Sequence, residues 1–263
     1  MRRLAAAVCC WVLSAMLVGT QERPLPDPGP FLAAVRERLQ PDAARQSGYV
    51  YVETRRTRTL DGRGRTTRET VEEIESYPGL PGEPRWERTV SRNGAPVPAR
   101  ERDKADAERR SKAEAYAKRL ARETAAQAAR RRADGEKARA EARALVDDLF
   151  ATFEIALLDR QGVDGHETIR VSLTPRARPR TTTRTGGWLR HFRGHAWLSE
   201  AEYELVRLEV EALDTLSIGL GLARIHQGTS FTFERRKVNG EVWLPAKSAY
   251  ALSARVFLVK RMR

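Results

Sequence analysis

The chain has 263 residues, which is enough for one sizeable domain with an elaboration. A chain of this length buries about 70% of its unfolded surface, so a small scaffold that depends on disulfides is excluded. Hydrophobic residues make up 41% and charged residues 32%, which is typical of a globular protein. The formal net charge of +13 predicts a basic surface that attracts polyanions or anionic lipid.

Residues 1–20 have the layout of a secretory signal peptide: a short basic start, an apolar run, then small residues. The run is shorter than the roughly 20 residues of a membrane span, so we expect cleavage and export, with an uncleaved anchor as the alternative. Both cysteines, Cys9 and Cys10, lie in this segment, so we expect neither a disulfide nor a cysteine-ligated metal site after cleavage. Val8 precedes Cys9 where a lipid-modified cysteine would follow a small residue, so no lipoprotein is predicted.

An amphipathic helix is predicted near the start of the segment 21–99. The stretch from Phe31 to Leu39 has an apolar stripe at helical spacing, and Asp27 before Pro28 favours a helix start there. We expect this helix to lie on a sheet.

The first strands follow that helix. Residues 48–77 are rich in Tyr, Val, Thr and Ile and predict a long hairpin that turns at residues 60–64. Residues 86–90 extend it towards a turn at Asn93-Gly94. We expect these strands and the later ones to belong to one sheet.

A charged segment of different character occupies residues 100–150. It is rich in Ala, Arg, Glu and Lys, with opposite charges four residues apart, as in Asp106 and Arg110, which predicts a helix. Asp134-Gly135 predicts the break that makes it either a kinked helix or a helical hairpin. Large apolar residues gather only at its end, so we expect the segment to project into solvent and to dock through that end. The apolar residues are Leu145, Val146, Leu149, Phe150 and Phe153.

Strands return in residues 151–263. Two-residue periodicity runs through residues 189–198, 205–214, 219–238 and 241–260, and Asn239-Gly240 is a strong hairpin signal because both turn residues need a positive φ. Val206 and Ala212 are predicted to share one side of their strand with Leu208 and Val210. The fold class predicted is α+β: a curved antiparallel sheet, or half-open β-barrel, capped by helices and interrupted by a charged helical insert.

The corresponding domain organisation has four parts. We predict a signal peptide at 1–20, the first helix and strands of the sheet domain at 21–99, the helical insert at 100–150, and the remaining strands at 151–263.

No catalytic or metal site is predicted. His191 and His195 flank Arg193-Gly194 in a strand pattern, about 13 Å apart along the strand, and no third ligand stands nearby. His166 and His226 are isolated. The adjacent acidic pairs Asp147-Asp148 and Glu72-Glu73 point in different directions, and the common hydrolase, protease and phosphate-loop motifs do not occur. We therefore expect no enzyme activity and no cofactor.

Three basic stretches, 130–132, 176–180 and 235–237, are candidates for binding phosphate-rich polymers. Export would make lipopolysaccharide, anionic phospholipid or a cell-wall polymer the relevant polyanion, and nucleic acid is not expected. Along the helical segment the basic residues alternate with Glu and Asp, which favours an ordinary solvated surface.

The order of these elements resembles the periplasmic lipoprotein carriers and receptors of the Lol type. Within that superfamily, GHAWLSEAEYELVRLEVE followed by FTFERRKVNGEVWLP is similar to outer-membrane lipoprotein-sorting-like proteins. The positions that carry the resemblance are Gly194, Trp197, Val206, Arg207, Leu208, Asn239, Gly240, Trp243 and Pro245. The resemblance spans residues 48–260 without the charged segment, and it implies a concave sheet that binds acyl chains without catalysing a reaction.

The function predicted is that of a cell-envelope protein that binds a lipid or an acylated protein between its sheet and its helices. The alternative is an envelope scaffold whose basic helical insert contacts an anionic polymer or a protein. An anionic membrane surface or an envelope polymer is the other candidate partner. The predicted cavity wall consists of Val171, Leu173, Val206, Leu208, Val210, Phe231, Phe233, Tyr250 and Leu252.

Overall fold

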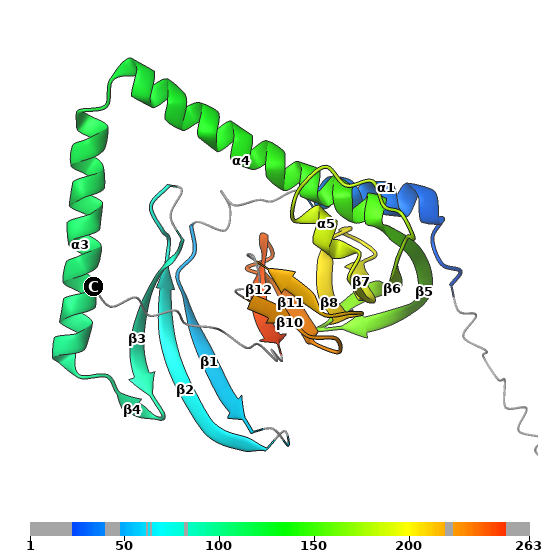
Figure 1. The fold of residues 1–263 in the computed structure, drawn as a ribbon, viewed down its shortest axis with the longest axis horizontal. Coiled ribbons are helices and arrows are strands. Elements are labelled where there is room, and N and C mark those ends of the chain that lie inside the picture. Colours follow the sequence, from blue (N-terminus) through cyan, green and yellow to red (C-terminus); the bar gives the residue numbers. More distant parts are fainter. Residues whose placement is uncertain are drawn as a thin grey trace, which may run out of the picture.

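The computed structural model describes residues 23–39, 48–61, 63, 65–81, 84–218 and 223–250. Over these residues the protein is α+β, with a four-stranded and a six-stranded antiparallel sheet. Figure 1 shows the two sheets side by side, one next to α3 and the other beneath α1, with α4 running across the top from the end of α3 to the six-stranded sheet. The predicted signal peptide lies outside the described residues.

The bounds of the elements are as follows. The helices are α1 (Pro28–Arg38), α3 (Ala99–Ala121), α4 (Ala125–Thr152) and α5 (Gly186–Leu189). The four-stranded sheet has the order β1 (Tyr51–Leu60), β2 (Thr66–Tyr77), β3 (Trp86–Arg92) and β4 (Ala95–Pro96). The six-stranded sheet has the order β12 (Val242–Tyr250), β11 (Ser230–Val238), β8 (Leu205–Ala212), β7 (Phe192–Ser199), β6 (His166–Pro175) and β5 (Phe153–Val163). A small pair is formed by β9 (Leu216–Ile218) and β10 (Ala223–Ile225).

The prediction of a single sheet is wrong, because β1–β4 form a sheet of their own. The physical reason lies in β1, whose side chains are exposed or half-exposed along its whole length. From Glu53 to Thr59 it carries only charged and polar side chains on both faces. Its arginines are paired with glutamates of β2 and β3, such as Arg58 with Glu69 and Arg55 with Glu87. Such a strand offers no apolar face to the core of the other sheet.

Helix α1 begins where the sequence predicts. The Asp27 carboxylate accepts a hydrogen bond from the Gly29 backbone N–H at 3.0 Å, and Pro28 occupies the first helical position, where its missing N–H costs nothing. Phe31 and Val35 point onto the six-stranded sheet and are buried. The prediction of an amphipathic helix on a sheet is confirmed.

The predicted break in the charged helical segment is misplaced. The chain breaks at Arg122–Thr124, where Thr124 and Gln127 form a reciprocal capping box at the start of α4. Gly135 lies inside α4, where a Cβ would meet no atom within 4 Å. A glycine inside an exposed helix costs only about 1 kcal/mol, which 28 residues of helix tolerate, whereas a capping box supplies a complete new start.

Helix α3 has no buried residue but does not stand free in solvent. Arg88 of β3 bonds Asp106 at 2.6 Å, and the Arg109 guanidinium lies over the rings of Tyr77 and Trp86. The predicted helical pair of Asp106 with Arg110 is thus replaced by a bond to the sheet. The interface between α3 and the four-stranded sheet is held mainly by charge and cation–π contacts.

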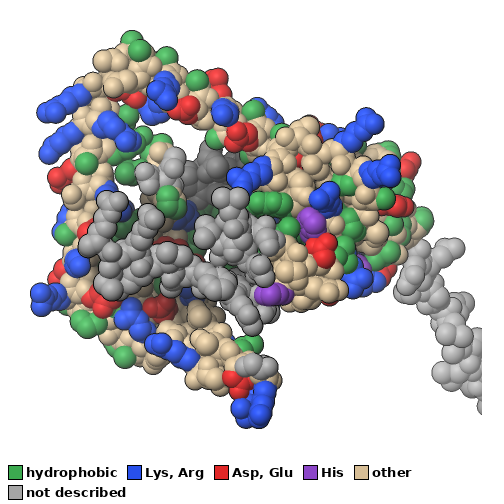
Figure 2. Space-filling view, in the orientation of Figure 1, with side chains coloured by type: hydrophobic (Ala, Val, Ile, Leu, Met, Phe, Trp, Pro, Cys, Tyr) green, Lys and Arg blue, Asp and Glu red, His purple; other side chains and the backbone are tan. Residues whose placement is uncertain are grey.

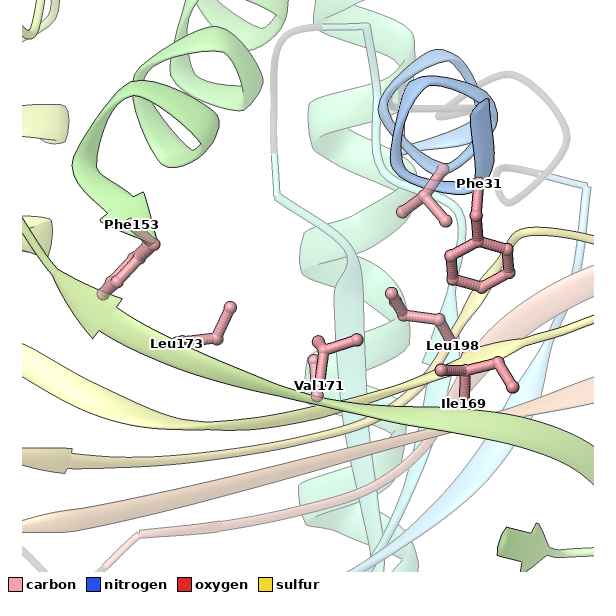
Figure 3. Close-up of a cluster of buried hydrophobic side chains, with 8 residues drawn as sticks. Phe31, Phe153, Ile169, Val171, Leu173 and Leu198 are labelled. Atoms are coloured by element: carbon pink, nitrogen blue, oxygen red, sulfur yellow. The ribbon is translucent and has the colours of Figure 1, made fainter. Parts of the chain in front are cut away.

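The core lies between the six-stranded sheet and the ends of α1 and α4. Figure 3 shows Val171 and Leu173 pointing up from β6 towards the helices, with Phe31 pointing down from α1 and Phe153 at the junction of α4 and β5. Leu149 and Phe150 of α4 pack against the same cluster, so the predicted docking of the helical segment through its C-terminal end is confirmed.

The predicted hairpin turns at Asn93-Gly94 and Asn239-Gly240 are confirmed by positive φ angles, and the turn at Asp164-Gly165 has the same form. Each of the three places two consecutive residues in the left-handed region, with φ between 50° and 81°. The strand predicted for residues 189–198 begins later, at Phe192, because residues 186–189 form α5, and Leu189 packs against the core there.

Candidate ligand-binding face

Two rows of side chains cross the six-stranded sheet on the face that the helices cover. Residues directly opposite each other in antiparallel strands share a face, so each row can be followed through the strand pairing. From β5 to β12, the first row is Leu157, Val171, Ala196, Leu208, Phe233 and Ser248. The second row is Ile155, Leu173, Gly194, Val210, Phe231 and Tyr250.

Exposure to solvent increases along both rows from the middle of the sheet to β12. Val171 and Leu173 are 1% and 5% exposed, because α1 and α4 cover them. Phe231 and Phe233 are only half-buried and lie outside the core cluster, with their rings stacked at a centroid separation of 6.3 Å. Tyr250 at the end is 64% exposed. We call Leu208, Val210, Phe231, Phe233 and Tyr250 the open face.

The structure brings most of the predicted cavity wall together on these two rows. Val171 and Leu173 form part of a packed core, whereas the five residues of the open face are the accessible part of the set. Leu252 lies outside the described residues.

Val206 differs from the predicted alternation. The pairing of β7 with β8 shifts between Trp197 and Leu198, so Leu198 lies opposite Leu205 and Trp197 lies opposite Arg207. Val206 is the extra residue of this β-bulge. It is buried, but it is Leu205 and Leu208, both partly buried, that pack against the core cluster. A bulge resets the two-residue period, which simple alternation in the sequence does not reveal.

Gly194 occupies the centre of the second row because no larger residue fits. A Cβ there would lie 1.9 Å from the Glu209 carbonyl oxygen on β8. This close approach of two backbones explains why a glycine stands among larger residues of β7.

Two depressions lie at the end of the sheet around the turn that joins β7 to β8. Their volumes are 390 Å³ and 220 Å³, and both are lined by Ala201 and Glu202. The larger one also contacts Arg23, His166 and Glu200, and the smaller one reaches Tyr203 and Trp243. Neither is lined by residues of the open face, and charged side chains line both, so they do not resemble a pocket for an acyl chain.

Three glutamates of this turn each hold one basic side chain of the sheet. Glu200 bonds Arg160 at 2.7 Å, and Glu204 bonds Arg235 at 2.8 Å. Glu202 accepts hydrogen bonds from Lys237 at 2.9 Å and from the Trp243 indole at 3.1 Å. The bond from Arg160 lowers the pKa of Glu200. Burial alone would raise the pKa of Glu202, but the hydrogen bonds from Lys237 and Trp243 lower it below the ordinary value.

One of the predicted basic stretches, 235–237, takes part in this network. Arg235 and Lys237 bond the glutamates of the turn, and Arg236 bonds Asp164 at 3.2 Å. Each of the three basic side chains therefore has a carboxylate partner.

Asp148 is a buried carboxylate that the sequence does not single out. It is 2% exposed and accepts four hydrogen bonds, from the backbone N–H and the hydroxyl groups of Thr182 and Thr183, at 2.6 to 3.1 Å. Burial by itself would raise its pKa, but the bonds from Thr183 and Thr182 outweigh this and hold the pKa below its ordinary value. Its neighbour Asp147 instead bonds Arg36 of α1 at 2.7 Å. The two acids thus have separate structural roles. The only sign of the role of Asp148 in the sequence is the run of threonines at 181–183.

The histidines are placed separately. His191 Nδ1 lies 2.8 Å from Asp214 Oδ1, His195 lies beside Trp197, and His166 contacts the ring of Trp243. Within the described part of the chain, no group of three or more His, Cys, Asp or Glu side chains is arranged to hold a metal ion.

Comparisons with protein-family models, with curated proteins and with solved structures find no match for this chain. Among the helices that the structure describes, none combines the length and the apolar character needed to cross a membrane.

Proposed function

We propose that this protein is a non-enzymatic, exported cell-envelope protein that binds a lipid or the acyl chain of an acylated partner on the open face. The observation that carries the proposal is the exposure gradient along the two rows: the helices cover the apolar face over β5 to β7 and leave it accessible over β8, β11 and β12. A soluble protein rarely leaves neighbouring large apolar side chains accessible unless they bind something.

The chemistry of the open face fits an extended apolar chain. Leu208 and Phe233 are direct cross-strand neighbours, as are Val210 and Phe231, so they form one continuous strip. The strip offers no charged side chain of its own, and each methylene group that it removes from water contributes about 0.8 kcal/mol. A chain of a few methylene groups lying across β8 and β11 thus gains several kcal/mol before any headgroup contact.

The proposal includes the half-open barrel and the helical insert that the sequence predicts. We take the six-stranded sheet with α1 to be the half-open barrel of a carrier similar to the Lol type, and α3 and α4 to be a helical insert between the parts of that fold. Support comes from Gly194, whose close backbone contact with Glu209 brings β7 and β8 tightly together next to the open face. Export is proposed from the signal-like segment 1–20.

The test is organic-solvent extraction of the purified protein followed by mass spectrometry. We expect acyl lipid in near-stoichiometric amount, together with uptake of a fluorescent fatty acid by protein stripped of lipid. A protein that carries no lipid and takes up no fatty acid would overturn the proposal, and the open face would then be a contact surface of another kind.

A further inference from the structure

The loop between β6 and β7 concentrates positive charge more than any other described segment of the six-stranded sheet. Between Thr168 and Ser199 the chain contains no Asp or Glu. We call the segment 175–190 the arginine loop; its five arginines are Arg176, Arg178, Arg180, Arg184 and Arg190, and all five are exposed. Alternation with acidic residues, which indicates an ordinary solvated surface on α3 and α4, is absent here.

Within the described part of the chain, no carboxylate pairs with these five guanidinium groups. This differs from the strands of the same sheet, where Arg160, Arg170 and Arg235 each bond a carboxylate at 2.5 to 2.8 Å. Acidic side chains around the loop have other partners: Asp148 bonds Thr182 and Thr183, Asp214 bonds His191, and Glu211 lies 3.7 Å from Arg193. The charge of the arginine loop is therefore directed at solvent.

The loop is anchored rather than loose. The Asp148 carboxylate beneath it accepts the four hydrogen bonds from Thr182 and Thr183, and the Thr183 hydroxyl accepts a further one from the Gly186 N–H at 2.8 Å. A Cβ on Gly186 would lie 2.1 Å from the Asp148 carboxylate, so the backbone is pressed against it. An anchored loop loses less conformational entropy on binding than a free one.

The arginine loop is at the same end of the sheet as Val210, Phe231 and Tyr250, the second-row residues of the open face. It leads through α5 into β7, where Gly194 lies opposite Val210, and Val210 lies opposite Phe231. Arg184 lies 5.8 Å from the ring of Trp188, which gives the loop a half-buried aromatic group beside its cations. Tryptophan with neighbouring arginines is the combination found where proteins meet a membrane–water interface.

We propose that the arginine loop binds the phosphate groups of an anionic phospholipid surface. Clusters of four to eight basic side chains provide such binding, and each contributes about a fivefold gain in partitioning near an anionic surface. The proposal stands independently of the open face. If that face binds no lipid, the loop still binds the bilayer. If the face does bind lipid, the loop places the edge of the open face next to the bilayer from which the lipid comes.

The test is cosedimentation of the purified protein with vesicles of equal parts phosphatidylglycerol and phosphatidylcholine, and with vesicles of phosphatidylcholine alone. The test variant is the triple substitution Arg178→Gln, Arg180→Gln, Arg184→Gln. The matched control is Arg132→Gln, Arg139→Gln, Arg143→Gln, which removes the same charge from exposed positions of α4. Circular dichroism verifies that both variants are folded.

We expect binding to the anionic vesicles only, a loss of about a hundredfold for the loop variant, and a much smaller loss for the α4 control. Binding should also weaken with added salt. An equal loss in both variants, or none in the loop variant, would overturn the proposal. Release by a few millimolar inorganic phosphate at constant ionic strength would overturn it too, because the loop would then be a site for free phosphate.

Discussion

Leu208 of β8 and Phe233 of β11 lie directly opposite each other, half-buried, at the point where the covered part of the sheet gives way to the open face. Thr232 precedes Phe233 in β11, and its side chain is on the opposite face of the sheet. This pair therefore allows the two faces of one strand to be tested separately.

Phe233→Asp should abolish retention of lipid by the open face, because a carboxylate would have to be desolvated beside the acyl chain. Thr232→Asp, with the same new charge on the opposite face, should retain lipid. Arg207, which lies over the Trp197 ring on that opposite face, is a second control position. Lipid content is measured by mass spectrometry after extraction, and equal lipid in Phe233→Asp and the parent would contradict the face assignment.

Asp148→Asn should destabilise the protein at neutral pH by about 2–3 kcal/mol, because hydrogen bonds to a charged group are replaced by weaker ones. The pKa of Asp148 is lowered in the folded protein, so its stabilisation is fully present above the unfolded pKa and is lost as pH falls through the folded pKa.

The measurement for Asp148 is the melting temperature of parent and Asp148→Asn protein as a function of pH. The difference should be constant from neutral pH to about pH 5 and shrink below about pH 4, where the carboxylate of the unfolded chain becomes protonated. A difference that is independent of pH down to the acid limit would show that the charge of Asp148 does not anchor the arginine loop.

Gly194→Ala should destabilise the six-stranded sheet by about 1–3 kcal/mol, because its Cβ would meet the Glu209 carbonyl oxygen at 1.9 Å. The control is Gly162→Ala on β5, where a Cβ meets nothing within 4 Å. Urea denaturation of the two variants measures the free energy of unfolding. Equal stability of both would mean that β7 and β8 are less tightly apposed at Gly194.

Gly135→Ala should stabilise α4 by about 1 kcal/mol, since the position is helical and open. Thr124→Ala should cost about 1 kcal/mol by removing the capping box. Thermal unfolding followed by circular dichroism at 222 nm compares the two. A loss of helical signal in Gly135→Ala would place the helix break at Asp134-Gly135 after all.

Much of the local structure could be predicted because it depends on neighbouring residues. The start of α1 follows from Asp27-Pro28, and the hairpin turns at Asn93-Gly94 and Asn239-Gly240 follow from the need for two positive φ angles. The prediction placed the helix break at Asp134-Gly135 because this dipeptide is a common helix-breaking signal. The break at Thr124 depends on a capping box, which requires the side chains of Thr124 and Gln127 together. For the candidate face, alternation predicted Leu208, Val210, Phe231 and Phe233 together, and the bulge at Val206 was missed.

By itself, the sequence determined which side chains alternate, where the chain turns and where charge accumulates, because each of these depends on spacings of a few residues. Only the tertiary structure decided that the strands divide between two sheets, that Asp148 anchors the arginine loop, and that the helices stop short of Phe231 and Tyr250. The physical reason is that burial is a property of long-range packing. The same apolar face of the sheet is core where the helices cover it and open face beyond them, and the alternation of residues in the strands is the same in both places.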